Sequence, residues 1–363
     1  MRVLTLILAL ATGAPPALFS TGGERPIPLQ KTPPGIATQS ARACAGCHSE
    51  IYLQWKESMH SAAWNDAQFQ ELWRARSREQ KCLHCHSPLT AQLRRIDGQP
   101  NPAFRPTLQS QGVTCAACHI RDGAVVGAGT STTTPPHPVA VDKALAGAGM
   151  CASCHQQDVP GRTKGIYDTY REWLSTKQAR AGGSCGDCHM PRVMGNVAVG
   201  VHRSYRSHGF AGAHSDEMLQ RALTVTVLLD KPVHAPGESL TARVEVRNTG
   251  AAHSVPSGDP AHQIRVVAGL ADSQGEFIEK VETLLARKQE RDAPYRERID
   301  TRLAPSAART IKLQTQLPHS LGDHYLIVQL SYHLMSPEKA AELGVPESAV
   351  SRVFDTQIVP VGP

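Results

Sequence analysis

Cys44-Ala45-Gly46-Cys47-His48 is the first of five copies of one short pattern, Cys-x-x-Cys-His. The other copies begin at Cys82, Cys115, Cys151 and Cys185. The five copies use all ten cysteines of the 363-residue chain: Cys44, Cys47, Cys82, Cys85, Cys115, Cys118, Cys151, Cys154, Cys185 and Cys188. A pattern that includes every cysteine of a chain indicates one repeated chemical task.

That task is the attachment of c-type haem. Two thiols three residues apart can each bond to one vinyl group of the same porphyrin, and the histidine that follows can then bind the iron. We therefore predict five covalently attached c-type haems. Their proximal iron ligands are His48, His86, His119, His155 and His189.

Other uses of the cysteines fit this pattern less well. Zinc sites take Cys-x-x-Cys pairs two at a time, and five pairs do not divide by two. A thioredoxin-type motif occurs once, near a βαβ pattern. A disulfide framework suits an exported chain, but it leaves five histidines at one fixed offset unexplained.

The N-terminus predicts export. Met1-Arg2 precedes an apolar run over residues 3–11, which is typical of a secretory signal peptide ending near residue 20 rather than of a membrane span. An uncleaved membrane anchor is the alternative. Residues 21–40 are rich in Pro and Gly and are predicted to form a flexible lead-in. We therefore expect a periplasmic protein, because haem is attached to c-type cytochromes outside the cytoplasm.

The formal charge of +6 does not argue for a nucleic-acid partner. Each ferric haem carries two propionates and adds about −1, so five haems bring the mature protein close to neutral. The chain has six Phe, seven Tyr and four Trp, which is few for its length. We expect the flat, apolar porphyrins to supply the missing core.

Distal iron ligands are sought among the remaining histidines. His60 is the last residue of a predicted helix over 49–60, on the flank of a stripe that includes Tyr52 and Trp55. His208 lies near basic residues and precedes Gly209-Phe210, whose ring can pack on a porphyrin. His137 lies between prolines that hold it in an extended conformation.

Two further histidines, His214 and His253, are weaker candidates for distal ligands. Both lie on predicted loops, and a plain surface position is the alternative for each. A methionine is the alternative ligand for one haem, and four lie near the motifs: Met59, Met150, Met190 and Met194.

The pattern changes near residue 223. Leu240, Ala242, Val244 and Val246 alternate with polar residues, as in a strand buried on one face. About seven such strands follow, with a helical insertion over 337–343. The predicted fold is a mainly α, haem-cored cytochrome domain over 41–222, followed by an all-β, immunoglobulin-like sandwich domain over 223–363.

Several segments of the first domain resemble the cytochrome c554-like family of multihaem cytochromes c. They are Cys44–His48 with Tyr52, Trp55 and His60; Gly112–Cys115; Glu172-Trp173; Cys188–Pro191; and Arg206–Phe210. The resemblance implies periplasmic electron transfer, closely packed haems and mainly bis-histidine ligation. Related nitrogen-cycle enzymes bind substrate at a haem with a Cys-x-x-Cys-Lys motif or a tyrosine crosslink, whereas all five motifs here end in His.

The first functional hypothesis is therefore an electron carrier, with a redox protein or a quinol-oxidising membrane complex as partner. The alternative is a reductase or oxidase in which one open haem acts on a small nitrogen or sulfur compound. The sequence assigns no catalytic residue, so the choice between carrier and enzyme stays open.

Overall fold

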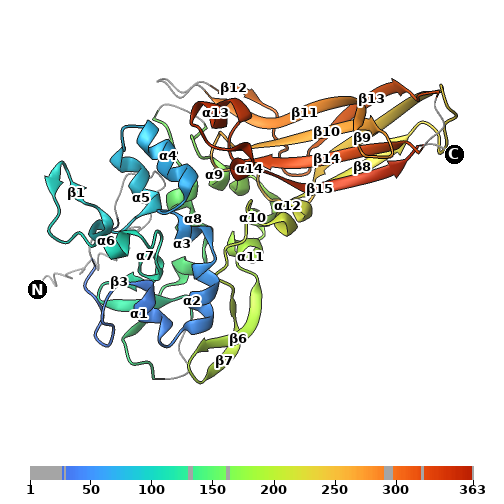
Figure 1. Cartoon of the computed structure of the whole chain (residues 1–363). Coiled ribbons are helices and arrows are strands. Elements are labelled where there is room, and N and C mark those ends of the chain that lie inside the picture. Colours follow the sequence, from blue (N-terminus) through green and yellow to red (C-terminus); the bar gives the residue numbers. More distant parts are fainter. Residues whose placement is uncertain are drawn as a thin grey trace, which may run out of the picture.

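The computed structural model describes residue 27 and residues 30–129, 134–160, 164–289, 297–319 and 323–361. The predicted signal peptide and the first part of the lead-in lie outside these residues. Short helices and small sheets form one part of the molecule, and two large sheets extend from it as the other part (Figure 1). No helix among the described residues has the length and hydrophobicity to cross a bilayer.

The first part of the chain contains helices of four to nine residues. They are α1 Ala41–Ala45, α2 Ser49–Lys56, α3 Met59–Ala62, α4 Ala67–Ala75, α5 Leu83–His86, α6 Pro106–Gln109, α7 Cys115–His119, α8 Ala148–His155, α9 Thr169–Leu174, α10 Lys177–Arg180, α11 Gly186–His189 and α12 Asp216–Ala222. Three single turns of 3-10 helix add η1 Gln80–Cys82, η2 Thr90–Gln92 and η3 Lys143–Ala146. Helices this short are marginal without tertiary support.

Four of the motifs share one local structure. The proximal histidine is the last residue of a helix at His86, His119, His155 and His189. Residues three and four apart lie on the same face of a helix, so one turn presents both thiols and the imidazole together. At the first motif the chain bends earlier, and His48 instead precedes α2.

The prediction of a mainly α first domain was too simple, because small sheets occur between the helices. They are β1 Arg95–Ile96 with β2 Gln99–Pro100; β3 Ile120–Arg121 with β4 Ala124–Gly127 and β5 Val139–Val141; and β6 Arg192–Ala198 with β7 Val201–Arg206. The β6–β7 hairpin spans a stretch rich in arginine and histidine. It is a two-stranded sheet because Val197 and Tyr205 bury their side chains while the charged residues point outward.

The second part of the chain is a two-layer sandwich of antiparallel strands. One sheet has the order β12 Glu297–Asp300, β11 Phe277–Gln289, β10 Gln263–Ala271, β14 Tyr325–His333 and β15 Ser351–Pro360. The other has the order β13 Ala308–Gln316, β9 Ser239–Asn248 and β8 Leu223–Leu229. Val244 and Val246 of the second sheet pack in one core with Ile264 and Val328 of the first.

The sequence signal for the sandwich was therefore read correctly as alternating strands. Leu240, Ala242, Val244 and Val246 are at most 1% exposed. The helical insertion is also present, as α13 Pro337–Glu342 and α14 Glu347–Val350. The assignment of the sandwich to the immunoglobulin-like class remains a prediction.

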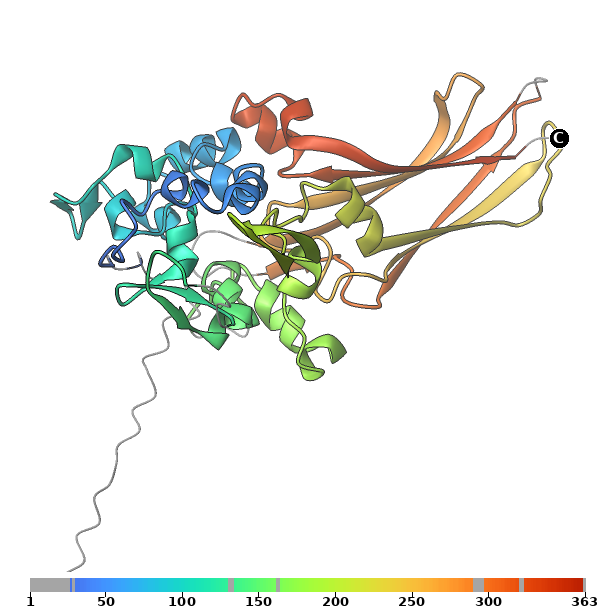
Figure 2. The ribbon, with the colours of Figure 1, turned by 90° about the horizontal axis from the view of Figure 1, so that it is seen from below.

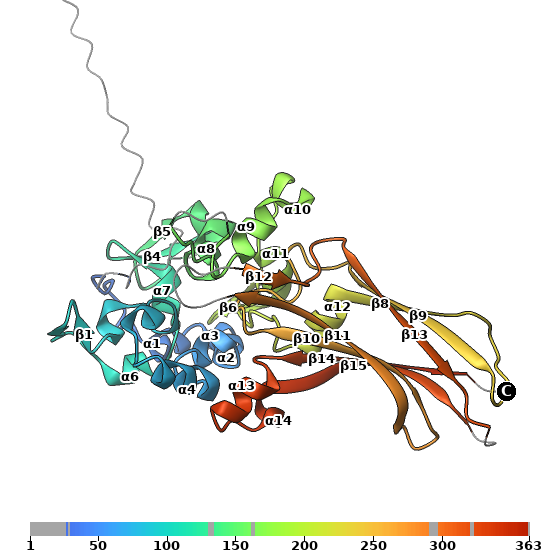
Figure 3. The ribbon, with the colours of Figure 1, turned by 90° about the horizontal axis from the view of Figure 1, so that it is seen from above.

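The two parts meet along one end of the sandwich, whose strands run away from the helices (Figures 2 and 3). On one side α4 lies beside α13, and Leu72 packs against the apolar cluster of Met335 and Ala340. On another side α9 contacts the loop between β9 and β10 through its Glu172. Residues of both parts therefore lie close to the haem-attachment motifs.

Candidate haem-binding sites

Four proximal histidines each face a second histidine ring. The ring centres are 6.5 Å apart for His48 and His137, 6.4 Å for His155 and His60, 6.1 Å for His119 and His208, and 6.2 Å for His189 and His253. An imidazole nitrogen binds a first-row metal at about 2 Å, so two rings on opposite sides of one metal have centres roughly 6 Å apart. All four pairs fit bis-histidine ligation of a haem iron.

Backbone carbonyls orient the proximal rings. The Nδ1 atoms of His86 and His119 each lie 2.8 Å from a carbonyl oxygen, of Ala63 and Val126. His189 Nδ1 lies 2.6 Å from the Ala211 oxygen, and His48 makes the same contact with Val197. A ring that donates from Nδ1 leaves Nε2 as the ligand atom, which is the common arrangement at metal-bound histidine.

Two distal rings are neutral at pH 7 because they are buried among other imidazoles. Burial, with His155 and His208 adding to it, lowers the pKa of His60 to about 4. Burial and the neighbouring His119 lower the pKa of His208 to about 4 as well. Neutral imidazole is the form that binds iron, so both rings are ready to act as ligands.

The position of His60 depends on Gly112. Gly112 has a φ of +59°, and a Cβ atom there would lie 2.5 Å from the His60 carbonyl oxygen. The next residue, Val113, donates its N–H to that same oxygen at 2.9 Å and accepts from Trp55 Nε1 at 2.8 Å. This explains in physical terms why a glycine precedes the third motif.

His208 is held from two sides. Its backbone N–H donates to the Gln54 side chain at 2.9 Å, and Gln54 in turn donates to the Tyr205 hydroxyl at 2.8 Å. Phe210 packs edge-on against His60, with ring centres 4.3 Å apart, and lies 5.7 Å from His208. One aromatic ring therefore contacts the candidate distal rings of two sites.

His137 is positioned by the lead-in. Gly35 has a φ of +81° and approaches Pro136 so closely that a Cβ atom would lie 2.0 Å from the Pro136 oxygen. Residues 30–40, predicted as flexible, thus pack against the segment that carries a distal ring.

The ring of His253 comes from the sandwich, and a buried carboxylate holds its loop. Glu172 of α9 accepts from the Ser254 N–H at 3.1 Å and from the Ser257 hydroxyl at 2.9 Å. Arg302, only 7% exposed, pairs with Glu172 at 2.8 Å and with Asp300 at 2.9 Å. Sequence reasoning missed this connection, although Glu172 belongs to a segment that resembles the family.

The second motif differs from the other four. All seventeen histidines lie within the described residues, yet none faces His86 at a comparable distance. The ring in contact with His86 is Phe69 of α4, stacked at 3.7 Å and 7°. A ring stacked on the imidazole face leaves Nε2 free for iron, so the His86 site has a proximal ligand and no paired distal one.

His214, a predicted distal ligand, pairs with no proximal ring in the described structure. Its electrostatic neighbours include Asp66 and His262, and Asp66 is also a neighbour of His86. His214 therefore lies in the surroundings of the second motif without facing its histidine as the other distal rings do.

Cysteines of different motifs lie side by side. In three pairs the two thiols lie close enough for each to shift the pKa of the other: Cys44 and Cys115, Cys85 and Cys154, and Cys151 and Cys185. His60 of the fourth site also neighbours His208 of the third. The attachment sites thus form a connected series, with the first beside the third, the third beside the fourth, and the fourth beside both the second and the fifth.

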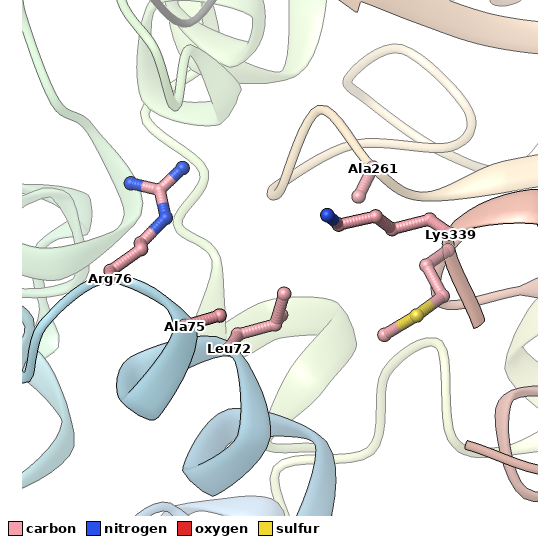
Figure 4. A pocket seen from close by; sticks show the side chains of 6 residues that line it. Leu72, Ala75, Arg76, Ala261 and Lys339 are labelled. Carbon is pink, nitrogen blue, oxygen red and sulfur yellow. The ribbon is translucent and has the colours of Figure 1, made fainter. Parts of the chain in front are cut away.

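A pocket of about 380 Å³ lies where α4 meets the sandwich part (Figure 4). It is lined by Leu72, Ala75, Arg76, Ala261, Met335 and Lys339. Arg76 and Lys339 extend from opposite walls of the pocket; Arg76 directly follows α4, and Lys339 belongs to α13. Arg76 is also an electrostatic neighbour of Cys82, so the pocket borders the second motif.

One family model and one solved structure of a multihaem cytochrome are similar to this chain. A family model described as "Cytochrome c554 and c-prime" matches residues 43–120. The fold is similar to the crystal structure of a penta-heme cytochrome c552 from Thermochromatium tepidum, with a TM-score of 0.68 and 20% identity over 91% of this chain and 100% of that chain. The family match and the shared fold together support a multihaem cytochrome c. The structural match to the penta-heme cytochrome c552 covers both parts of this chain, so it includes the sandwich.

Other solved structures match only a part of the cytochrome. The CARDB domain of the PF1109 protein from Pyrococcus furiosus has a TM-score of 0.20 and 15% identity, covering 38% of this chain and 86% of its own. Spo0M from Bacillus subtilis has a TM-score of 0.18 and 11% identity, covering 39% and 50%. No curated protein sequence matches the chain.

Proposed function

We propose that this protein is a periplasmic pentahaem cytochrome c that transfers electrons between redox partners. The observation that carries the proposal is the set of four facing histidine pairs, because two imidazoles give a low-spin iron suited to electron transfer. Haem supplies the one-electron chemistry, and the protein's residues bind and orient each haem. The connected attachment sites support a continuous route through the first domain.

The proposed ligand sets follow from the pairs. His48 acts with His137, His119 with His208, His155 with His60, and His189 with His253. We also propose that the domain boundary lies at residue 223 and that the sandwich is of the immunoglobulin-like class. In this proposal the sandwich supplies one haem ligand, His253. The partner is a redox protein or a quinol-oxidising membrane complex.

Haem counting and a redox titration test this proposal. The purified protein should contain five covalent haems, accept five electrons and exchange them rapidly with a small redox mediator. A protein with fewer haems, or one whose haems do not reduce through a common mediator, would contradict it.

A second candidate function is supported by the unpaired His86. An iron with one protein ligand can bind an external molecule, so we infer that the second haem takes a small nitrogen or sulfur compound as a reductase or oxidase would. Electrons would reach it from the neighbouring fourth site. A ferric high-spin signal that disappears on ligand addition supports this function, and five low-spin haems exclude it.

A further inference from the structure

We propose that the sandwich completes the second haem site, with the Tyr332 hydroxyl as hydrogen-bond donor to a small uncharged ligand and His262 as a positioning residue. The inference rests on the second candidate function above. It adds the groups that would recognise the ligand and the class of ligand they fit.

The first observation is a buried hydroxyl without a partner. Tyr332 lies on β14 and is 2% exposed, and its hydroxyl makes no hydrogen bond with any described residue. Buried polar atoms nearly always have a partner, and an exception commonly marks a place where a ligand or water binds. Burial, reinforced by the nearby Asp259 carboxylate, raises the pKa of the Tyr332 phenol, so the group remains a donor.

The second observation is the location of this hydroxyl. Phe69 stacks on His86 at 3.7 Å, and the preceding residue, Gln68, donates to the Leu334 carbonyl oxygen at 3.3 Å, just past the end of the strand that carries Tyr332. The end of β14 therefore lies beside the second motif, and the Asp259 carboxylate acts on the pKa of both His86 and Tyr332. His262 lies against Tyr332, with ring centres 5.6 Å apart, and its Nδ1 is 3.2 Å from the Ser257 carbonyl oxygen. This contact directs the other ring nitrogen away from the backbone and fixes the ring beside the tyrosine.

The charges around the site favour an uncharged ligand. Asp66 and Asp259 are the acidic neighbours of His86. Arg352, the cation that acts on the pKa of Tyr332, already pairs with Asp216 at 2.6 Å. Two carboxylates repel an anion, whereas a neutral molecule with an acceptor atom, such as nitric oxide, hydroxylamine or carbon monoxide, meets no such penalty.

Infrared spectroscopy of carbon monoxide bound to the fully reduced holoprotein tests the proposal. A donor at the bound ligand lowers the C–O stretching frequency and slows dissociation. In Tyr332→Phe we expect the band to move to higher frequency and dissociation to become roughly two- to tenfold faster, the effect of losing one hydrogen bond. Tyr325→Phe, on the same strand but outside the site, should match the parent protein.

A measurement on the parent protein guards against a variant that fails to fold. The band should shift when the protein is exchanged into D2O, because the phenolic proton exchanges. An unshifted band together with an unchanged Tyr332→Phe band would overturn the donor role while leaving the second haem open. Failure of carbon monoxide to bind at all would overturn the open site itself, and the electron-carrier proposal would stand.

Discussion

The ring of His253 lies 6.2 Å from the ring of His189, at an interplanar angle of 16°, although one belongs to the sandwich and the other to the fifth motif. The two-layer sandwich therefore contributes a ring to the candidate fifth haem site. If His253 is the ligand that we propose, the fifth site forms only when both parts of the molecule are in contact. Stability of that contact and ligation of the fifth haem should change together.

Replacing His253 with Ala should open the fifth site. The iron loses one imidazole, so one low-spin EPR signal should convert to high spin, and added imidazole should restore it. His202→Ala is the matched control, because His202 is exposed and its Nδ1 contacts only the Asn196 side chain, at 3.4 Å. An unchanged spectrum in His253→Ala would exclude His253 as a ligand.

Glu172→Ala should weaken the contact between the two parts. It removes the acceptor for Ser254 and Ser257 and leaves the buried Arg302 with Asp300 as its carboxylate partner. Breaking a buried ion pair costs about 3 kcal/mol, so the free energy of unfolding in guanidinium should fall by roughly that amount.

The control for this variant is Glu245→Ala. Glu245 pairs with Arg247 at the surface, where both side chains are more than a third exposed, and such a pair contributes less than about 1 kcal/mol. The fifth low-spin signal should broaden in Glu172→Ala alone. Equal losses of stability in the two variants would refute the special role of Glu172.

Gly112→Ala should disturb the fourth site. The new Cβ would strain a left-handed backbone and meet the His60 carbonyl oxygen, which lies in the turn that carries a distal ring. We expect the free energy of unfolding to fall by about 1–3 kcal/mol. We also expect an altered low-spin signal from the haem bound by His155.

Gly98→Ala is the control that separates the backbone strain of Gly112→Ala from its contact with the His60 carbonyl oxygen. Gly98 also has a positive φ, of +76°, but nothing lies within 4 Å of its added Cβ. This variant should show the backbone cost without any change in the haem spectrum. A changed spectrum in both variants would show that the contact with His60 is not what matters.

The sequence allowed the local features of the fold and sites to be predicted. A fixed spacing such as Cys44-x-x-Cys47-His48 encodes attachment chemistry within one helical turn, and period-2 alternation from Leu240 to Val246 encodes a buried strand. Of the five distal candidates, the structure brings four opposite proximal rings: His60, His137, His208 and His253.

The pairing itself could not be predicted, because it depends on contacts between segments far apart in the chain. His60 faces the fourth motif rather than the first, which precedes it directly, since Val113 and Gly112 fix its turn from elsewhere. Phe69 and Tyr332 were missed for the same reason. An ordinary amphipathic helix and an ordinary strand carry them, and only the tertiary structure gives them a role.

The most direct test of the account is an EPR spectrum of the oxidised protein, with a haem count on the same sample. We predict five haems, of which four are low spin and one is high spin, and conversion of the high-spin signal on addition of nitric oxide or imidazole. The four tilts of 16° to 51° between paired rings should separate the low-spin signals. Five low-spin haems, or a high-spin signal that persists unchanged when His86 is replaced, would contradict the account.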